Sequence, residues 1–155
     1  MPQRIQLQVN GQRHEAELEP EMPLLYFLRN ELQLNGPKYG CGLQQCGSCM
    51  VLLDGKAQPS CVLPVVAAQQ HSITTLEGLG TAERMNRVQR AFVEEQAAQC
   101  GYCLNGMIIS AQALLDATPS PSEEEIKTAL ARVLCRCGTH TRMMRAVQRA
   151  ARHLQ

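Results

Sequence analysis

The sequence predicts an α+β chain, with a small mixed sheet in its N-terminal half and a four-helix bundle in its C-terminal half. Three observations carry this prediction. Apolar and polar residues alternate in short runs in the first half, apolar residues recur at helical spacing in the second, and eight cysteines divide into four per half. Because 155 residues suffice for two small units, we expect domains at 1–78 and 79–155, divided near Gly78-Leu79-Gly80.

The first predicted hairpin lies at the N-terminus. Ile5, Leu7 and Val9 alternate with polar residues, and Asn10-Gly11 follows. Asn-Gly suits a type I′ turn because both residues tolerate a positive φ. Residues 13–18 then form the return strand.

A short helix and a second hairpin complete the expected sheet. Pro23 precedes the apolar run 24–28, and proline favours the first helical position. Residues 50–53 predict another strand, which Asp54-Gly55 ends in a tight turn. We expect a final strand at residues 73–76, giving a mixed sheet crossed by one helix.

Four helices are expected in the second half. Apolar residues at helical spacing predict helices over 83–96 and around 107–115. Ser122 and Glu125 form a capping box at the start of a third helix. The fourth begins near residue 139, and its inward residues are Met144, Val147, Ala151 and Leu154. Short connections between them favour a bundle.

Composition excludes several classes of protein. The net charge is +1, which gives no reason to expect a nucleic acid partner. No apolar run approaches the ~18 residues of a membrane span. No signal peptide is visible, so eight cysteines favour metal ligation in the reducing cytoplasm over disulfides.

The first cysteine set has the spacing of a plant-type ferredoxin. Cys41, Cys46 and Cys49 read C-x4-C-x2-C, and Cys61 follows after eleven residues. This spacing is typical of four thiolates around one [2Fe–2S] cluster, and glycines between the ligands let the backbone approach it. Zinc sites usually show two short pairs instead.

The second set is less specific by itself. Cys100 and Cys103 read C-x2-C, and Cys135 and Cys137 read C-x-C. An antiparallel bundle would bring both loops to one end and complete a four-thiolate site. Taken alone, these cysteines could equally hold zinc, or the first pair could be a redox dithiol.

Three motifs together resemble the small iron–sulfur subunit of the xanthine dehydrogenase (molybdenum hydroxylase) family. They are residues 40–49, Gln99-Cys-Gly-Tyr-Cys103 and Cys135-Arg-Cys-Gly-Thr139, in family order and at family-like separations. The resemblance extends to the small subunits of bacterial aldehyde and N-heterocycle (isoquinoline or nicotinate type) oxidoreductases. It implies a plant-type ferredoxin-like (β-grasp) domain followed by a helical domain, each holding one [2Fe–2S] cluster.

The resemblance also implies partners and roles. The large subunit would carry molybdopterin and oxidise an aldehyde or an N-heterocycle, so this chain would be an oxidoreductase subunit without a substrate-converting site. Gln99 and Cys137 match family residues that contact the pterin. Electrons would leave from the N-terminal cluster to FAD on a medium subunit, or to a cytochrome.

Three positions depart from the family's usual residues. Asn105 replaces a proline, Val133 replaces an asparagine and His140 replaces a tyrosine. None of the three is a ligand, and we interpret His140 as a helix-start residue because four cysteines already complete the site.

Four arginines recur at helical spacing near the C-terminus, at positions 142, 145, 149 and 152. One interpretation is a solvated face whose charge suits a helix C-terminus. The other is a docking face for an acidic partner or for cofactor phosphates.

The sequence therefore favours a two-cluster electron-transfer subunit. Two alternatives are a free-standing ferredoxin-like carrier and a zinc-stabilised interaction module.

Overall fold

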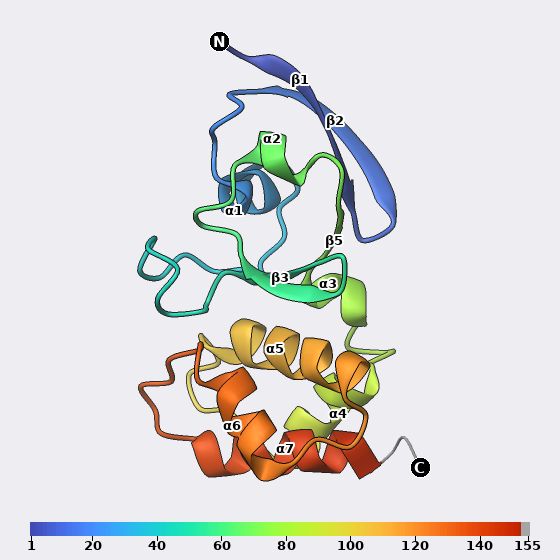
Figure 1. Ribbon diagram of the computed structural model, residues 1–155, viewed down its shortest axis with the longest axis vertical. Helices are drawn as coiled ribbons and strands as arrows, with labels where there is room; N and C mark the ends of the chain where they lie inside the picture. The colour runs from blue at the N-terminus through green and yellow to red at the C-terminus, as the bar shows by residue number, and fades with distance from the viewer. Residues whose placement is uncertain (153–155) are drawn as a thin grey trace.

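A five-stranded mixed sheet forms the N-terminal half of the computed structural model, which describes residues 1–152. The strands are β1 (Gln3–Val9), β2 (Gln12–Leu18), β3 (Met50–Leu53), β4 (Lys56–Pro59) and β5 (Ser72–Thr74). Their order is β2-β1-β5-β3-β4, and only the β1–β5 pair is parallel. In Figure 1 the sheet occupies the upper part of the molecule and the helical half lies below it.

The first hairpin forms as the sequence predicts. Ile5, Leu7 and Val9 are buried on one face of β1, while β2 is mostly exposed. Asn10 and Gly11 have φ values of 51° and 78°, which are those of a type I′ turn.

Short helices cover the sheet. The helix expected after Pro23 is α1 (Leu24–Tyr26), which continues as a π-helical turn, η1 (Phe27–Glu31). Another short helix, α2 (Val65–Ala68), has no sequence signal, because four residues are too few to show a period. Buried residues of these helices and of β1, β2, β3 and β5 make one core: Ile5, Leu7, Val9, Leu18, Leu24, Phe27, Leu28, Val51, Val65, Ala68 and Ile73.

The final strand lies slightly earlier than the expected range of 73–76. The strand is Ser72–Thr74, and Leu76 begins a short helix, α3 (Leu76–Leu79). Thr75 ends the strand because its amide donates to Asn10 Oδ1 at 2.8 Å and its hydroxyl donates to Glu77 at 2.7 Å. These side-chain bonds replace the next strand pairing.

Four helices form the second half: α4 (Arg87–Glu94), α5 (Leu104–Ala117), α6 (Glu123–Leu130) and α7 (His140–Arg152). The helix expected at 83–96 is shorter, since Asn86 and Gln89 form a capping box that starts it at Arg87. The predicted capping box of Ser122 and Glu125 is present. Leu154, expected on the inner face of α7, lies outside the described residues.

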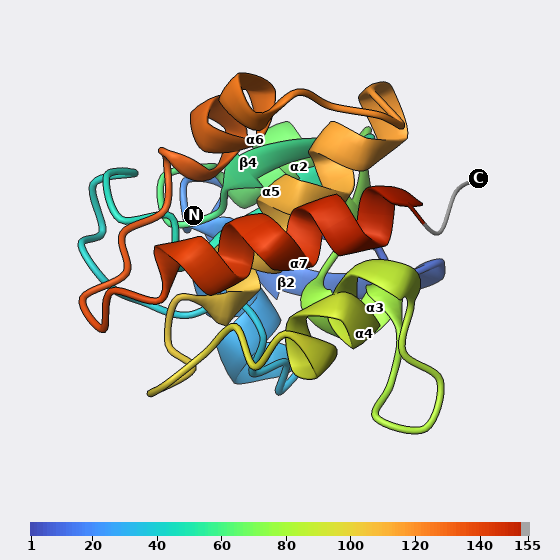
Figure 2. The same ribbon diagram turned by 90° about the horizontal axis from the view of Figure 1, so that it is seen from below.

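The helices pack around one core. Its central members are Met107, Leu115, Ile126, Met143 and Val147. Seen from below, α7 crosses the centre of this layer (Figure 2). The α+β class is confirmed, and so is the change from a sheet to helices along the chain. Within residues 1–152, no helix is both long and apolar enough to span a membrane.

Apolar side chains join the two halves of the molecule along one seam. Met50 and Leu52 of β3 pack directly on Ile109 of α5, and Met50 and Ile109 are fully buried. Each fully buried side chain of this size contributes about 1.5–3 kcal/mol relative to an exposed one. The seam therefore fixes β3, which follows the first cysteine loop, against α5, which follows the second.

Candidate iron–sulfur sites

Both cysteine loops lie on one side of the molecule, at the left in Figures 1 and 2. The first occupies the irregular segment between η1 and β3, and Cys61 follows β4. The second consists of the segment before α5 and the segment between α6 and α7. The loops meet directly, because the amide of Leu134 donates to the carbonyl of Cys46 at 3.0 Å.

The first loop wraps its backbone around sulfur atoms. Cys41 Sγ accepts the amides of Leu43, Gln45 and Cys46 at 3.2–3.3 Å. Cys46 Sγ accepts the amide of Cys41 at 3.3 Å. Gly42 and Gly47 have positive φ values of 68° and 72°, which this tight winding requires. Such a cradle of N–H groups stabilises negative charge on the sulfurs.

The thiols respond to this environment. Burial raises the pKa of Cys41, but the amides of Leu43, Gln45 and Cys46 outweigh burial and bring the pKa down to about 7. For Cys49, burial dominates and raises the pKa to about 11. A bound iron would have to displace the Cys49 proton, as metal binding to thiols generally does.

The second loop likewise contains one thiol with a lowered pKa and one with a raised pKa. Burial also opposes ionisation of Cys135, yet the hydroxyl and amide of Thr139 lower its pKa to about 7. Burial raises the pKa of Cys103 to about 12. Each loop thus contains both a thiol whose pKa is lowered and a buried thiol whose pKa is raised.

The cysteines come together in pairs. Cys41 contacts Cys46 and Cys49 contacts Cys61 in the first set. In the second set Cys100 contacts Cys137, and Cys103 contacts Cys135. Among residues 1–152, no three His, Cys, Asp or Glu side chains converge on one ion position. Pairing suits a [2Fe–2S] cluster, in which each iron takes two thiolates and the bridging sulfides complete its coordination.

The predicted pterin contacts lie at the surface of the second loop. Gln99 is exposed beside Cys100, which is also exposed, while Cys137 is half-buried. A partner could therefore reach Gln99 without any rearrangement of the helices. His140 is exposed at the first position of α7, as the sequence predicts.

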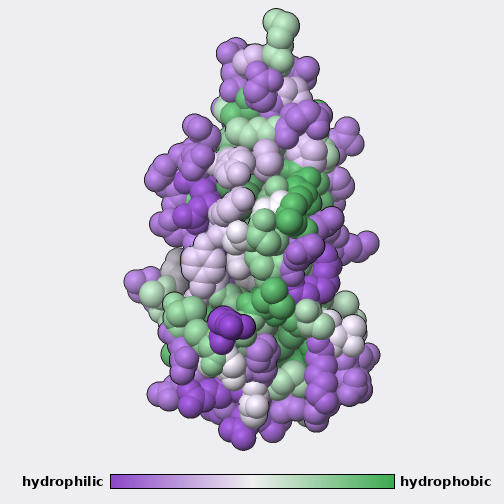
Figure 3. Space-filling view, turned by 90° about the vertical axis from the view of Figure 1, so that its left-hand side faces the viewer, coloured by the Kyte–Doolittle hydropathy of each residue, from purple (hydrophilic) through white to green (hydrophobic). Residues whose placement is uncertain are grey.

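Hydrophobic side chains surround the cysteine loops. Leu43 and Leu134, one in each loop, are both 64% exposed. The side of the molecule that carries the loops faces the viewer in Figure 3, where hydrophobic residues interrupt the polar surface. Exposed apolar side chains beside redox ligands are typical of a surface that a partner covers.

The sequence missed two contributors to the sites. Asn105, which stands out in the sequence only as a departure from the family, is buried and bonded to the backbone of the first loop. Thr139 stands out only as part of a motif, yet its hydroxyl lies 3.5 Å from Cys135 Sγ. The signal for Asn105 is an amide placed two residues after Cys103, in an otherwise apolar helix start.

Two of the four C-terminal arginines have internal partners. Arg149 pairs with Glu94 and Glu95 of α4 at 2.5 and 3.0 Å, and Arg142 donates to the carbonyl of Gln96. These contacts hold α7 against α4. Neither alternative drawn from the sequence, a solvated face or a docking face, included this role.

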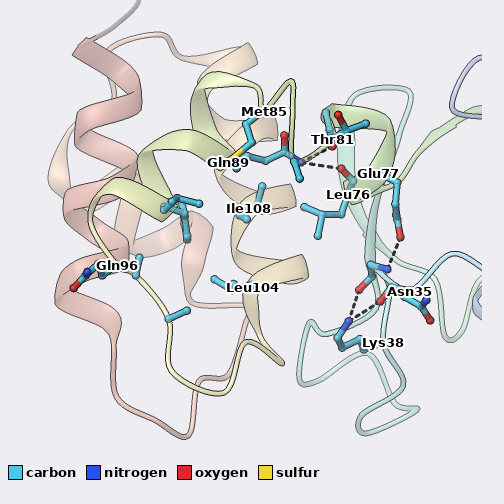
Figure 4. A pocket seen from close by; sticks show the side chains of 17 residues that line it. Asn35, Lys38, Leu76, Glu77, Thr81, Met85, Gln89, Gln96, Leu104 and Ile108 are labelled. Carbon is cyan, nitrogen blue, oxygen red and sulfur yellow. Dashed lines mark hydrogen bonds between the residues drawn. The ribbon is translucent and has the colours of Figure 1, made fainter.

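A groove of about 680 Å³ lies away from the cysteines (Figure 4). It runs between α4, α5 and the segment around Lys38, and its walls are mostly apolar. Two of its polar members are already bonded: Gln89 donates to the carbonyls of Leu76 and Gly80, and Glu77 accepts the amide of Gly36. None of the eight cysteines lines it.

Comparison with known proteins gives a consistent result. Residues 7–75 match the family described as a 2Fe-2S iron-sulfur cluster binding domain, and residues 75–148 match the [2Fe-2S] binding domain. A nicotinate dehydrogenase subunit of Pseudomonas putida is 58% identical over 97% of this chain and 96% of its own length. The alpha subunit of the isoquinoline 1-oxidoreductase of Brevundimonas diminuta is 43% identical over 96% and 97%.

Solved structures share the fold. Quinoline 2-oxidoreductase from Pseudomonas putida 86 superposes with a TM-score of 0.87 at 38% identity, covering 98% of this chain and 97% of the matched one. The aldehyde oxidoreductase of Desulfovibrio desulfuricans gives 0.93 at 39% identity. There the match covers 97% of this chain but only 17% of the other, so in that protein the same unit is part of a much longer chain.

Proposed function

The chain belongs to the molybdenum hydroxylase family as its small iron–sulfur subunit, and from this membership we propose the ligands, the partners and the substrate class of its complex. The chain is an electron-transfer subunit of an oxidoreductase, with a large catalytic partner. The observation that carries the proposal is the paired arrangement of eight cysteines in two loops that touch.

Each cluster is held by four thiolates. The ligands of the first cluster lie in a unit spanning 1–78 and are Cys41, Cys46, Cys49 and Cys61. The ligands of the second lie in a unit spanning 79–155 and are Cys100, Cys103, Cys135 and Cys137. When bound, a [2Fe–2S] cluster takes up and releases one electron at a time. The protein supplies amide donors to the sulfurs and partial burial, which are the factors that tune a cluster's potential.

The second loop faces the molybdopterin of the large subunit. Gln99 is exposed beside Cys100, and its amide both donates and accepts hydrogen bonds, as recognition of a pterin edge requires. Cys137 lies against the same edge. The first loop, at the other end of the relay, passes electrons to FAD on a medium subunit or to a cytochrome. Because cysteine thiolates stay reduced in the cytoplasm, we place the protein in that compartment.

The substrate of the complex is an N-heterocycle. Four similar proteins carry names that specify nitrogen heterocycles, namely nicotinate, isoquinoline, quinoline and nicotine. The nicotinate protein is 58% identical to this chain. An aldehyde is the second candidate, because the aldehyde oxidoreductase of Desulfovibrio desulfuricans shares this fold.

Purification from cells tests the assignment. We expect a brown complex in which this chain holds about four irons and a larger chain holds molybdenum. A brown chain that purifies alone would favour the free-standing carrier. A colourless chain with stoichiometric zinc would contradict the cluster assignment altogether.

Gln99→Ala tests the pterin contact. The exposed side chain makes no contribution to the helical core, so we expect the iron content to be unchanged. Reduction of the clusters by nicotinate in the assembled complex should slow by roughly tenfold, the effect of losing one hydrogen bond of about 1.4 kcal/mol. Gln148→Ala on α7 is a matched control. An unchanged rate in the Gln99→Ala complex would refute the contact.

A further inference from the structure

Asn105 is the only buried asparagine among residues 1–152, and it lies where the two cysteine loops meet. It is the second residue of α5, two positions after Cys103, and is 1% exposed. Its side-chain Nδ2 donates to the carbonyl of Ser48 at 2.9 Å and to the carbonyl of Met50 at 2.8 Å. One amide group therefore holds the residues on both sides of Cys49.

The orientation of this amide is determined by its partners. Both are carbonyl oxygens, which only accept, so the NH2 group must face them. The opposite atom, Oδ1, is buried and has no partner anywhere within residues 1–152. A half-satisfied buried amide is costly, and an apolar residue of the same shape would avoid that cost. Its use at this position therefore suggests a role in geometry more than in stability.

The Asn105 side chain bonds the edge of β3 at the point where β5 no longer pairs with it. The pairing of β3 with β5 reaches only Leu52, opposite Thr74, so Met50 lies two residues beyond the last pair. There the Asn105 side chain donates to the Met50 carbonyl, as a neighbouring strand would. The amide thus attaches α5 to the edge of β3 that β5 leaves free.

The seam around Asn105 leaves little room for adjustment. A Cβ atom on Gly106 would lie 2.3 Å from the carbonyl oxygen of Gly47, so the backbones of the two loops are already in close contact. The bond from Leu134 to the Cys46 carbonyl lies in the same region. Together with the close contact and this bond, the Asn105 amide holds the start of α5 in place relative to Cys49.

We propose that Asn105 is a positioning residue for electron transfer between the two clusters. By bridging Ser48 and Met50 to the start of α5, it fixes a ligand of the first cluster, Cys49, relative to a ligand of the second, Cys103. The rate of electron tunnelling between two clusters depends on the distance between them, so a shift of α5 relative to Cys49 would change that rate. This inference rests on the proposed ligands and on the chain being the electron relay of its complex.

The test is flash photoreduction of the iron-complete complex by a deazaflavin radical, which follows the redistribution of one electron between the clusters. Asn105→Leu keeps the branched shape of the side chain and removes both hydrogen bonds. We expect its iron and sulfide content to match the parent and its electron redistribution to slow a few-fold, because the rate of tunnelling between redox centres falls as the distance between them grows. Ser110→Ala, at a buried polar position of the same helix, should redistribute electrons at the parent rate.

Asn105→Ala is the second variant, in case leucine does not fit the seam. A parent-like redistribution rate in either iron-complete variant would overturn the inference. So would the failure of both variants to form an iron-complete complex, since the residue would then be structural. If the parent itself lacked two clusters, the proposed function would fail. If the parent relays electrons and Asn105→Leu does so equally fast, only this inference fails.

Discussion

Replacing Cys46 with serine should remove the N-terminal cluster and leave the C-terminal one in place. The iron content falls from about four to about two per chain, because a hydroxyl is a far poorer iron ligand than a thiolate. The contact between the loops survives, since Leu134 donates to the backbone carbonyl of Cys46 and not to its side chain. Metal analysis and EPR spectroscopy of the dithionite-reduced protein measure the result.

Ser48→Ala is the matched control for this substitution. Ser48 lies in the same loop, with its hydroxyl 3.5 Å from Cys46 Sγ, and is not a proposed ligand. Its alanine variant should keep about four irons and both EPR signals. If the Cys46→Ser chain stayed folded but lost both signals, the assignment of eight cysteines to two separate sites would be wrong.

Gly106→Ala should destabilise the contact between the two cysteine loops. The new Cβ would lie 2.3 Å from Gly47 O, a backbone atom, and 2.9 Å from Val133 Cγ1, so α5 must move away from the first loop. Overpacking costs about 1–3 kcal/mol, while alanine regains up to about 1 kcal/mol of helix propensity. We expect a net loss of about 2 kcal/mol, or roughly 4–8 °C in Tm, in the iron-loaded protein.

Gly11→Ala separates crowding from the general effect of losing a glycine. A Cβ at Gly11 meets nothing within 4 Å, and only its positive φ of 78° opposes the substitution. The cost there should be about 1 kcal/mol. Equal thermal stability of the Gly106→Ala protein and its parent would contradict the close approach of the two loops.

Local patterns in the sequence are sufficient to predict most elements. The alternation of Ile5, Leu7 and Val9 and the Asn10-Gly11 turn predict the first hairpin, and Ser122 with Glu125 predicts the start of α6. Each of these signals lies within a few residues. Cysteine spacing likewise marks the two loops, and in the structure the members of each set contact one another in pairs.

What the sequence missed depends on contacts between distant residues. The end of β5 depends on Asn10, more than sixty residues earlier, whose side chain bonds Thr75. Asn105 bonds residues from the other half of the chain, so its role has no local period or motif. The internal partners of Arg149 lie on α4, and only the packing of α7 brings them together.

This chain relays electrons through two clusters from a molybdenum partner. Rapid-freeze EPR spectroscopy of the assembled complex, mixed with nicotinate without oxygen, tests it most directly. Two distinct [2Fe–2S] signals should appear within the turnover time, and both should vanish when an electron acceptor is added. A complex that oxidises nicotinate while neither cluster signal appears would contradict this relay.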